Sequence, residues 1–100
     1  MIKAVFYLHK KDVIGYEISG HAGYATKGYD IVCAAVSVLS QTITAELNNA
    51  VLNDCEGISV RLIEPNVRNR VLCETLIDGL KQIEEQYPKN LKVDVYETRN

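Results

Sequence analysis

Residues 31–52, IVCAAVSVLSQTITAELNNAVL, decide the fold of this chain. Their apolar residues recur at the spacing of an α-helix. Asp30 stands directly before the stretch, where an N-cap residue belongs. An apolar face this broad predicts a central, well-buried helix. The face consists of Ile31, Ala35, Val38, Thr42 and Ala45, widened by Val32, Val36, Leu39 and Ile43.

Strand patterns lie on both sides of this helix. Residues 2–8 and 13–19 alternate apolar and other side chains around a short polar turn, which predicts an antiparallel pair. Residues 58–63 and 91–96 predict two more strands, and residues 67–86 predict a second helix that ends at Tyr87-Pro88. The expected fold is therefore α+β, with element order β-β-α-β-α-β. The simplest packing is a two-layer sandwich, in which a mixed four-stranded sheet carries both helices on one face.

Composition limits the classes of function. A chain of 100 residues fits one domain, residues 1–100. Its 11 basic and 13 acidic residues leave no surplus to neutralise a phosphate backbone, so we expect no nucleic-acid partner. No apolar stretch is long enough to cross a membrane, and the first residues have no signal-peptide pattern, so we expect a cytoplasmic protein. Three cysteines without a C-x-x-C pair fit a reducing compartment, with no metal site or cofactor expected.

Cys33 and His21 are the candidate catalytic pair. If the helix begins at Ile31, Cys33 is its third residue, where free backbone N–H groups stabilise a thiolate. The same N–H groups are suited to hold an oxyanion. His21 ends the second strand, and the chain between it and the helix is long enough to fold back. A thiol nucleophile beside an imidazole base is the smallest set of groups that nucleophilic acyl transfer requires.

Each of these residues also has a structural interpretation that stays open. Cys33 fits equally well as a small buried core residue, and His21 as a loop histidine without a role. Asp30 either caps the helix or orients His21. Ser37, one turn beyond Cys33, either contacts the thiol or a substrate, or bonds a carbonyl of its own helix. Cys55 and Cys73 are expected to be structural.

Residues 20–29, GHAGYATKGY, hold three glycines without a regular period and predict a mobile loop. The glycines fit hinges or plain turns, and the two tyrosines fit either a substrate groove or an ordinary surface. The candidate substrate-loop residues are Gly20, Ala22, Gly23, Tyr24, Gly28 and Tyr29.

Two segments together carry a family resemblance. Gly20-His21-Ala22, followed by Gly28 and by residues 30–37, DIVCAAVS, resembles the ribosomal-processing cysteine protease family Prp. The resemblance extends over the whole chain in length and element order. It implies that His21 and Cys33 are the catalytic histidine and cysteine, with Asp30 and Ser37 as the motif's other polar residues.

The resemblance also implies a substrate and an assembly. Members of this family remove an N-terminal extension from a large-subunit ribosomal protein, cutting after an aromatic pair, and they form homodimers. The mobile loop is expected to order over the peptide. Two other functions stay open on the residues alone. One is a non-catalytic module that binds a peptide or ribosomal protein, and the other is a redox sensor based on Cys33.

Overall fold

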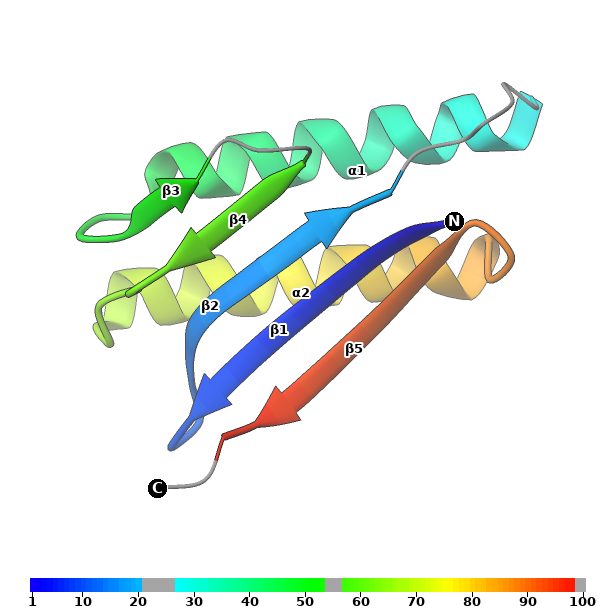
Figure 1. Ribbon diagram of the computed structural model, residues 1–100. Helices are drawn as coiled ribbons and strands as arrows, with labels where there is room; N and C mark the ends of the chain where they lie inside the picture. Colours follow the sequence, from blue (N-terminus) through cyan, green and yellow to red (C-terminus); the bar gives the residue numbers. More distant parts are fainter. Residues whose placement is uncertain (21–26, 54–56, 99–100) are drawn as a thin grey trace.

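The computed structural model describes residues 1–20, 27–53 and 57–98, with residues 27–30 and 53 described by their backbone alone. Five strands and two helices make up this part of the chain (Figure 1). In chain order they are β1 (Ile2–His9), β2 (Asp12–Ser19), α1 (Lys27–Glu46), β3 (Val51–Asn53), β4 (Ile58–Arg61), α2 (Val67–Gln86) and β5 (Leu91–Glu97).

The predicted four-stranded sheet and the order β-β-α-β-α-β were wrong. The sheet has five strands in the order β3-β4-β2-β1-β5. The additional strand is β3, a three-residue segment that pairs antiparallel with β4. The prediction assigned Val51 and Leu52 to the end of the first helix, because their apolar side chains continued its pattern. Pairing with β4, which no local pattern reveals, makes this segment a strand.

The sheet is mixed, and its central pair is the predicted hairpin. β1 pairs antiparallel with β2, from Lys3 opposite Ser19 to His9 opposite Asp12. β1 also pairs in parallel with β5, with Ile2 opposite Leu91. β2 pairs antiparallel with β4 over three residues only, with Tyr16 opposite Val60. Because the pairing of β2 with β4 stops at Ile18, Ser19 pairs with β1 but not with β4.

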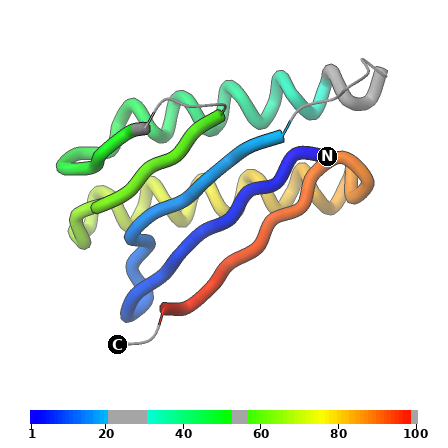
Figure 2. The backbone as a smooth tube through the Cα atoms, in the orientation of Figure 1, coloured from blue at the N-terminus to red at the C-terminus, as the bar shows by residue number. Residues whose placement is uncertain are grey.

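Both helices lie on the same side of the sheet, which gives two layers (Figures 1 and 2). α2 runs behind the central strands, whereas α1 runs along the side of β3, β4 and β2. α1 contacts α2 far more extensively than it contacts any strand. The core between the layers is built from alternate strand residues and one stripe of each helix. Its fully buried members include Ala4, Phe6, Tyr16, Val32, Leu76, Leu80 and Leu91.

α1 differs from the predicted helix at both ends. It begins at Lys27 rather than Ile31 and ends at Glu46 rather than near residue 52. Asn49 follows with a positive φ of 53°, a left-handed conformation that asparagine tolerates and that commonly ends helices. The Asn48-Asn49 pair was therefore a stop signal in the sequence, and the apolar residues beyond it obscured that signal.

α1 is also less buried than predicted. Val32, Val36, Ser40 and Ile43 are buried, but Ile31 is 56% exposed and Val38 is 67% exposed. The other members of the predicted first face, Ala35, Thr42 and Ala45, are exposed too. A helix in a two-layer fold has a partner on one side only, so half of this broad apolar surface stays in solvent.

The second helix coincides with its prediction, residues 67–86. Asn66 is its N-cap, and the Asn66 side chain accepts a hydrogen bond from the backbone N–H of Asn69 at 2.8 Å. Neither helix, over the described residues, combines the length and apolar character needed to cross a membrane.

Candidate active site

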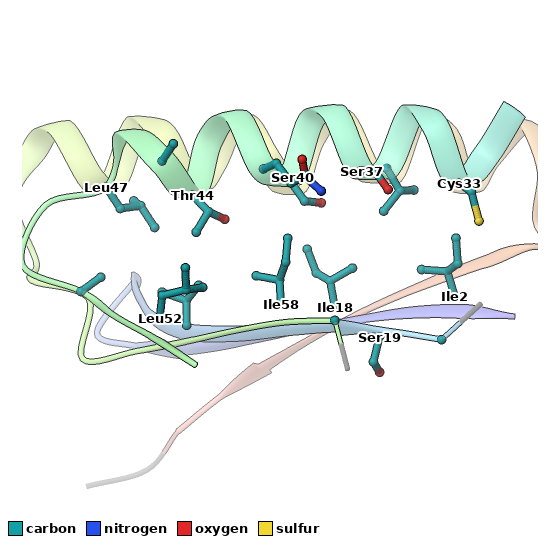
Figure 3. Close-up of a pocket in the computed structure, with 17 residues that line it drawn as sticks. Ile2, Ile18, Ser19, Cys33, Ser37, Ser40, Thr44, Leu47, Leu52 and Ile58 are labelled. Atoms are coloured by element: carbon teal, nitrogen blue, oxygen red, sulfur yellow. The ribbon is translucent and has the colours of Figure 1, made fainter. Parts of the chain in front are cut away.

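A groove with a volume of about 760 Å³ separates α1 from the strands on the β2 side of the sheet. Figure 3 shows its two walls, with α1 above and the ends of β2 and β4 below. The buried side chains Val32, Val36 and Ile43 hold α1 in the core, and the groove is the space beside them that no side chain fills. Its lining residues among those described include no Asp, Glu, Lys, Arg or His.

Small polar side chains form the helix wall of the groove. Cys33, Ser37, Ser40 and Thr44 succeed one another along α1 and point toward the strands (Figure 3). They stand at positions i, i+4, i+7 and i+11, a spacing that keeps side chains on one helix face. The sequence motif pointed to Cys33 and Ser37 but not to Ser40 or Thr44. The hydroxyl stripe within an apolar helix was the signal that could have found them.

Apolar side chains form most of the opposite wall. Ile18 and Ile58 lie below the middle of the groove, Ile2 lies below Cys33, and Leu52 of β3 lies near the far end (Figure 3). The groove therefore runs from Cys33 toward Leu47 and Leu52. Its α1 side mixes hydroxyl groups with Val36 and Ala45, and its strand side is mostly aliphatic. Such a slot suits an extended chain that carries apolar side chains.

Cys33 lies at one end of this groove and is partly exposed. Its Sγ points away from the α1 axis toward the strands (Figure 3). Cys33 also packs against the hydrophobic core, so its position combines a core contact with a place on the groove wall.

The predicted place of Cys33 in its helix was wrong. Because α1 begins at Lys27, Cys33 is the seventh helical residue rather than the third. The free N–H groups of a helix belong to its first turn, and the influence of the dipole decays over the same distance. The backbone at Cys33 therefore lacks the unpaired donors that the prediction assigned to the thiolate and the oxyanion. Asp30 likewise lies inside α1 and does not occupy the N-cap position.

Gly20 brings the strand that precedes His21 to the same end of the groove. Gly20 and Ser19 both line the groove together with Cys33. Gly20 has a φ of +98°, and a Cβ at this position would collide with the backbone carbonyl of Met1. Glycine is therefore required here, both for the left-handed conformation and for the close approach of the N-terminus.

Several predicted site residues lie outside the described residues. These are His21, Ala22, Gly23 and Tyr24. Gly28, Tyr29 and Asp30 belong to the first turn of α1, so the predicted loop is helical from Lys27 onward. Ser37 is exposed and lines the groove one turn from Cys33.

The other described cysteine has a different environment. Cys73 of α2 is fully buried, and burial raises its pKa from 9.0 to about 11. It does not line the groove. No group of three or more His, Cys, Asp or Glu side chains within the described residues is arranged to hold a metal ion. Cys73 is therefore not placed in the groove as a resolving partner for Cys33, and Cys55, the other candidate, lies outside the described residues.

Comparison with known proteins identifies the family. The family model described as cysteine protease Prp matches residues 1–92. The chain belongs to the Prp family of cysteine proteases. It is 30% identical over 98 residues to the ribosomal processing cysteine protease Prp of Bacillus subtilis, covering 85% of this chain and 88% of that protein. It is 35% identical over 94 residues to the Prp of Mycoplasma pneumoniae, covering 89% of each.

Solved structures agree with this fold. A crystal structure of a Streptococcus mutans protein superposes with a TM-score of 0.78 at 26% identity, covering 98% of this chain and 96% of that one. The ribosomal processing protease Prp of S. aureus, in complex with a substrate peptide, gives a TM-score of 0.83 at 22% identity, covering 95% and 99%. Membership of the Prp family makes the protein a cysteine protease and confirms the resemblance seen in residues 20–37.

Proposed function

We propose that this protease removes the N-terminal extension of a bacterial large-subunit ribosomal protein, with Cys33 as nucleophile and His21 as general base. One observation carries the assignment of the site. The partly exposed thiol of Cys33 points into the groove at the end that Gly20, the residue before His21, also lines. The related proteins of Bacillus subtilis and Mycoplasma pneumoniae are named as ribosomal processing proteases, which supports the substrate class.

The reaction follows from the two groups. His21 takes the proton of the Cys33 thiol, and the sulfur attacks the carbonyl carbon of the scissile bond. The resulting tetrahedral intermediate collapses as the C–N bond breaks, and the imidazolium of His21 gives its proton to the leaving amine. A water molecule, deprotonated by His21, then attacks the thioester. The extension leaves with a new carboxylate, and the thiol is restored.

The groove supports a specific way of holding the extension. Its aliphatic wall is suited to the aromatic pair after which members of this family cut, because burying such side chains removes apolar surface from water. Ser37, exposed beside Cys33, is placed to contact the peptide near the cut. Asp30 has the role of orienting His21, and the segment between β2 and α1 closes over the bound peptide.

A slightly acidic protease fits a basic partner. The chain has a net charge of −2, and a basic ribosomal-protein tail is attracted to such a surface over the distance of the Debye length. We place the reaction in the cytoplasm, where the ribosomal protein is made.

The proposed assembly is a homodimer. The exposed side of α1 supports it, because Ile31 and Val38 are large apolar residues in solvent and no charged residue occurs between positions 31 and 45. A continuous uncharged surface is typical of the buried centre of a protein interface. Sedimentation of the protein at several concentrations tests this assembly, and a monomer at every concentration contradicts it.

The test of the protease assignment compares three proteins on one peptide. The peptide copies the N-terminal extension and the first residues after it, and cleavage is followed by mass spectrometry. We expect cutting by the wild type, none by Cys33→Ala, and a large loss in His21→Ala. Cys73→Ala is the matched cysteine control and keeps its activity.

The same experiment separates the protease from the binding module. Unimpaired cleavage by Cys33→Ala would end the proposal. Binding of the peptide without cleavage by any of the proteins would favour the non-catalytic module instead.

A further inference from the structure

Ser40 is the most unusual polar group in the groove. It is 0% exposed, and its Oγ has no hydrogen-bond partner within the described part of the chain. A serine inside a helix ordinarily donates to the carbonyl four residues earlier. Thr75 of α2 behaves in this way, with its hydroxyl donating to the carbonyl of Val71 at 2.7 Å. An unpaired buried hydroxyl is costly, so the Ser40 position requires an explanation.

The position of Ser40 relative to Cys33 defines a distance along the groove. The two residues are seven positions apart on α1, which corresponds to about 10 Å of helical rise. An extended peptide advances about 3.3 Å per residue. A substrate lying parallel to α1, with its scissile bond at Cys33, therefore passes Ser40 about three residues from the cut.

The depth of Ser40 determines which part of the substrate can reach it. Cys33 and Thr44 are partly exposed and Ser37 is exposed, whereas Ser40 is fully buried in the same wall. A peptide backbone at the level of Cys33 lies too shallow to contact Ser40. Only a side chain that enters between α1 and the strands approaches the hydroxyl of Ser40.

The lining of the groove determines the chemistry of that side chain. No described lining residue is charged, so an ionised group would lose its hydration here without compensation. Ile18 and Val60 on the strand wall contact aliphatic or aromatic stems. The hydroxyl of Ser40 both donates and accepts, which matches a carboxamide or another hydroxyl.

We propose that Ser40 is a specificity-determining residue, whose hydroxyl binds a neutral hydrogen-bonding side chain of the substrate about three residues from the scissile bond. The inference rests on the proposed function for the identity of the peptide. It explains why the hydroxyl is unpaired in the free protein, since its partner arrives with the substrate. Ser40 takes no part in bond cleavage.

The test measures binding separately from cleavage. Cys33→Ala protein and a Cys33→Ala/Ser40→Ala variant are titrated with a fluorescent peptide that copies the extension. Each neutral polar residue of the peptide is replaced in turn by an apolar residue of similar shape, such as Gln by Met or Tyr by Phe. At one position we expect the replacement to raise Kd about three- to tenfold when Ser40 is present and to have no effect when it is absent.

A second measurement excludes a merely structural role. Ser40→Ala removes a buried unpaired group, so the Tm of the free protein rises or stays level while affinity for the unmodified peptide falls. Thr75→Ala, which removes a paired helical hydroxyl outside the groove, leaves affinity unchanged. The proposal is overturned if no peptide position couples to Ser40, or if Ser40→Ala lowers Tm and weakens every peptide equally.

The two proposals fail in different ways. Cleavage that does not need Cys33 contradicts the protease assignment, whatever happens at Ser40. Cleavage that needs Cys33, together with equal Kd values for every peptide in the presence and absence of Ser40, contradicts only the role of Ser40.

Discussion

The phenol oxygen of Tyr16 lies 2.7 Å from Oγ1 of Thr44, so a hydrogen bond joins the buried side of β2 to the groove wall of α1. Tyr16 is 0% exposed, and its ring lies 5.2 Å from that of Phe6, centroid to centroid. The buried side chains Val32, Val36 and Ile43 also hold α1 in the core. Because Thr44 lines the groove toward its Leu47 end, this bond helps to set the width of the groove there (Figure 3).

Tyr16→Phe should lower the free energy of unfolding at pH 7 by about 1 kcal/mol, because one hydrogen bond is lost while the ring remains. Tyr7→Phe is the matched control, since Tyr7 is exposed on the neighbouring strand β1. Urea unfolding at constant pH measures both changes. Equal stability of Tyr16→Phe and the wild type would show that the bond to Thr44 contributes nothing.

The same tyrosine makes stability depend on alkaline pH. Burial raises the pKa of Tyr16 from 10.0 to about 12. The folded state thus favours the neutral phenol. The stability that depends on this neutral form is fully present below pH 10 and is lost as the pH rises to about 12. We expect the wild type to lose stability more steeply than Tyr16→Phe between these values, by at most about 1.4 kcal/mol per pH unit. Parallel curves for the two proteins would contradict the expectation.

Cys33 and Cys73 should differ in their reaction with iodoacetamide. Cys33 is partly exposed in the groove, whereas Cys73 is buried in α2 with its pKa raised to about 11. Because only the thiolate reacts, we expect alkylation of Cys33 and protection of Cys73 at neutral pH. Peptide mass spectrometry distinguishes the sites, and unfolding in urea should expose both. Faster labelling of Cys73 in the folded protein would refute this assignment of environments.

Asn69 should be essential for stability although it belongs to no active site. Its Nδ2 donates to the carbonyls of Asn48 at 2.9 Å and Glu64 at 3.0 Å, and its Oδ1 accepts from the N–H of Asn48 at 3.2 Å. It is 1% exposed. Asn69→Leu leaves these backbone groups unpaired and should cost about 2–4 kcal/mol of unfolding free energy. Glu74→Ala, at an exposed position of the same helix, should cost less than about 1 kcal/mol. Similar losses in the two variants would contradict the network.

Gly79 of α2 faces the side chain of Leu39 in α1. A Cβ at this position would stand 2.5 Å from Cδ2 of Leu39 in α1. Gly79→Ala gains about 1 kcal/mol in helix propensity, and this gain should be cancelled by displacement of Leu39. In a Leu39→Ala background the same substitution should be stabilising. A double-mutant cycle by urea unfolding measures the coupling, and identical effects in the two backgrounds would exclude the contact.

Most regular elements were determined by local sequence. Alternation placed β1, β2 and β5 within a residue or two of their observed ends, and the stripe of residues 67–86 gave α2 its bounds. The DIVCAAVS segment identified the family, which the match over residues 1–92 confirms. These features depend on the period of the side chains and on short motifs, and both can be recognised in the sequence without knowledge of the fold.

Tertiary structure alone decided the rest. β3 exists because β4 supplies hydrogen bonds to it. The Asn48-Asn49 pair marks the end of α1 in the sequence, and the contact with Asn69 then holds the backbone of Asn48 beside α2. The groove lies between α1 and the ends of β2 and β4, although Val32, Val36 and Ile43 of α1 pack into the core. Helical period placed Cys33 and Ser37 on one face, but only the packing of α1 showed that Ser40 and Thr44 join them along a cavity. Long-range packing has no signature in a local pattern, since it depends on residues far apart in the chain.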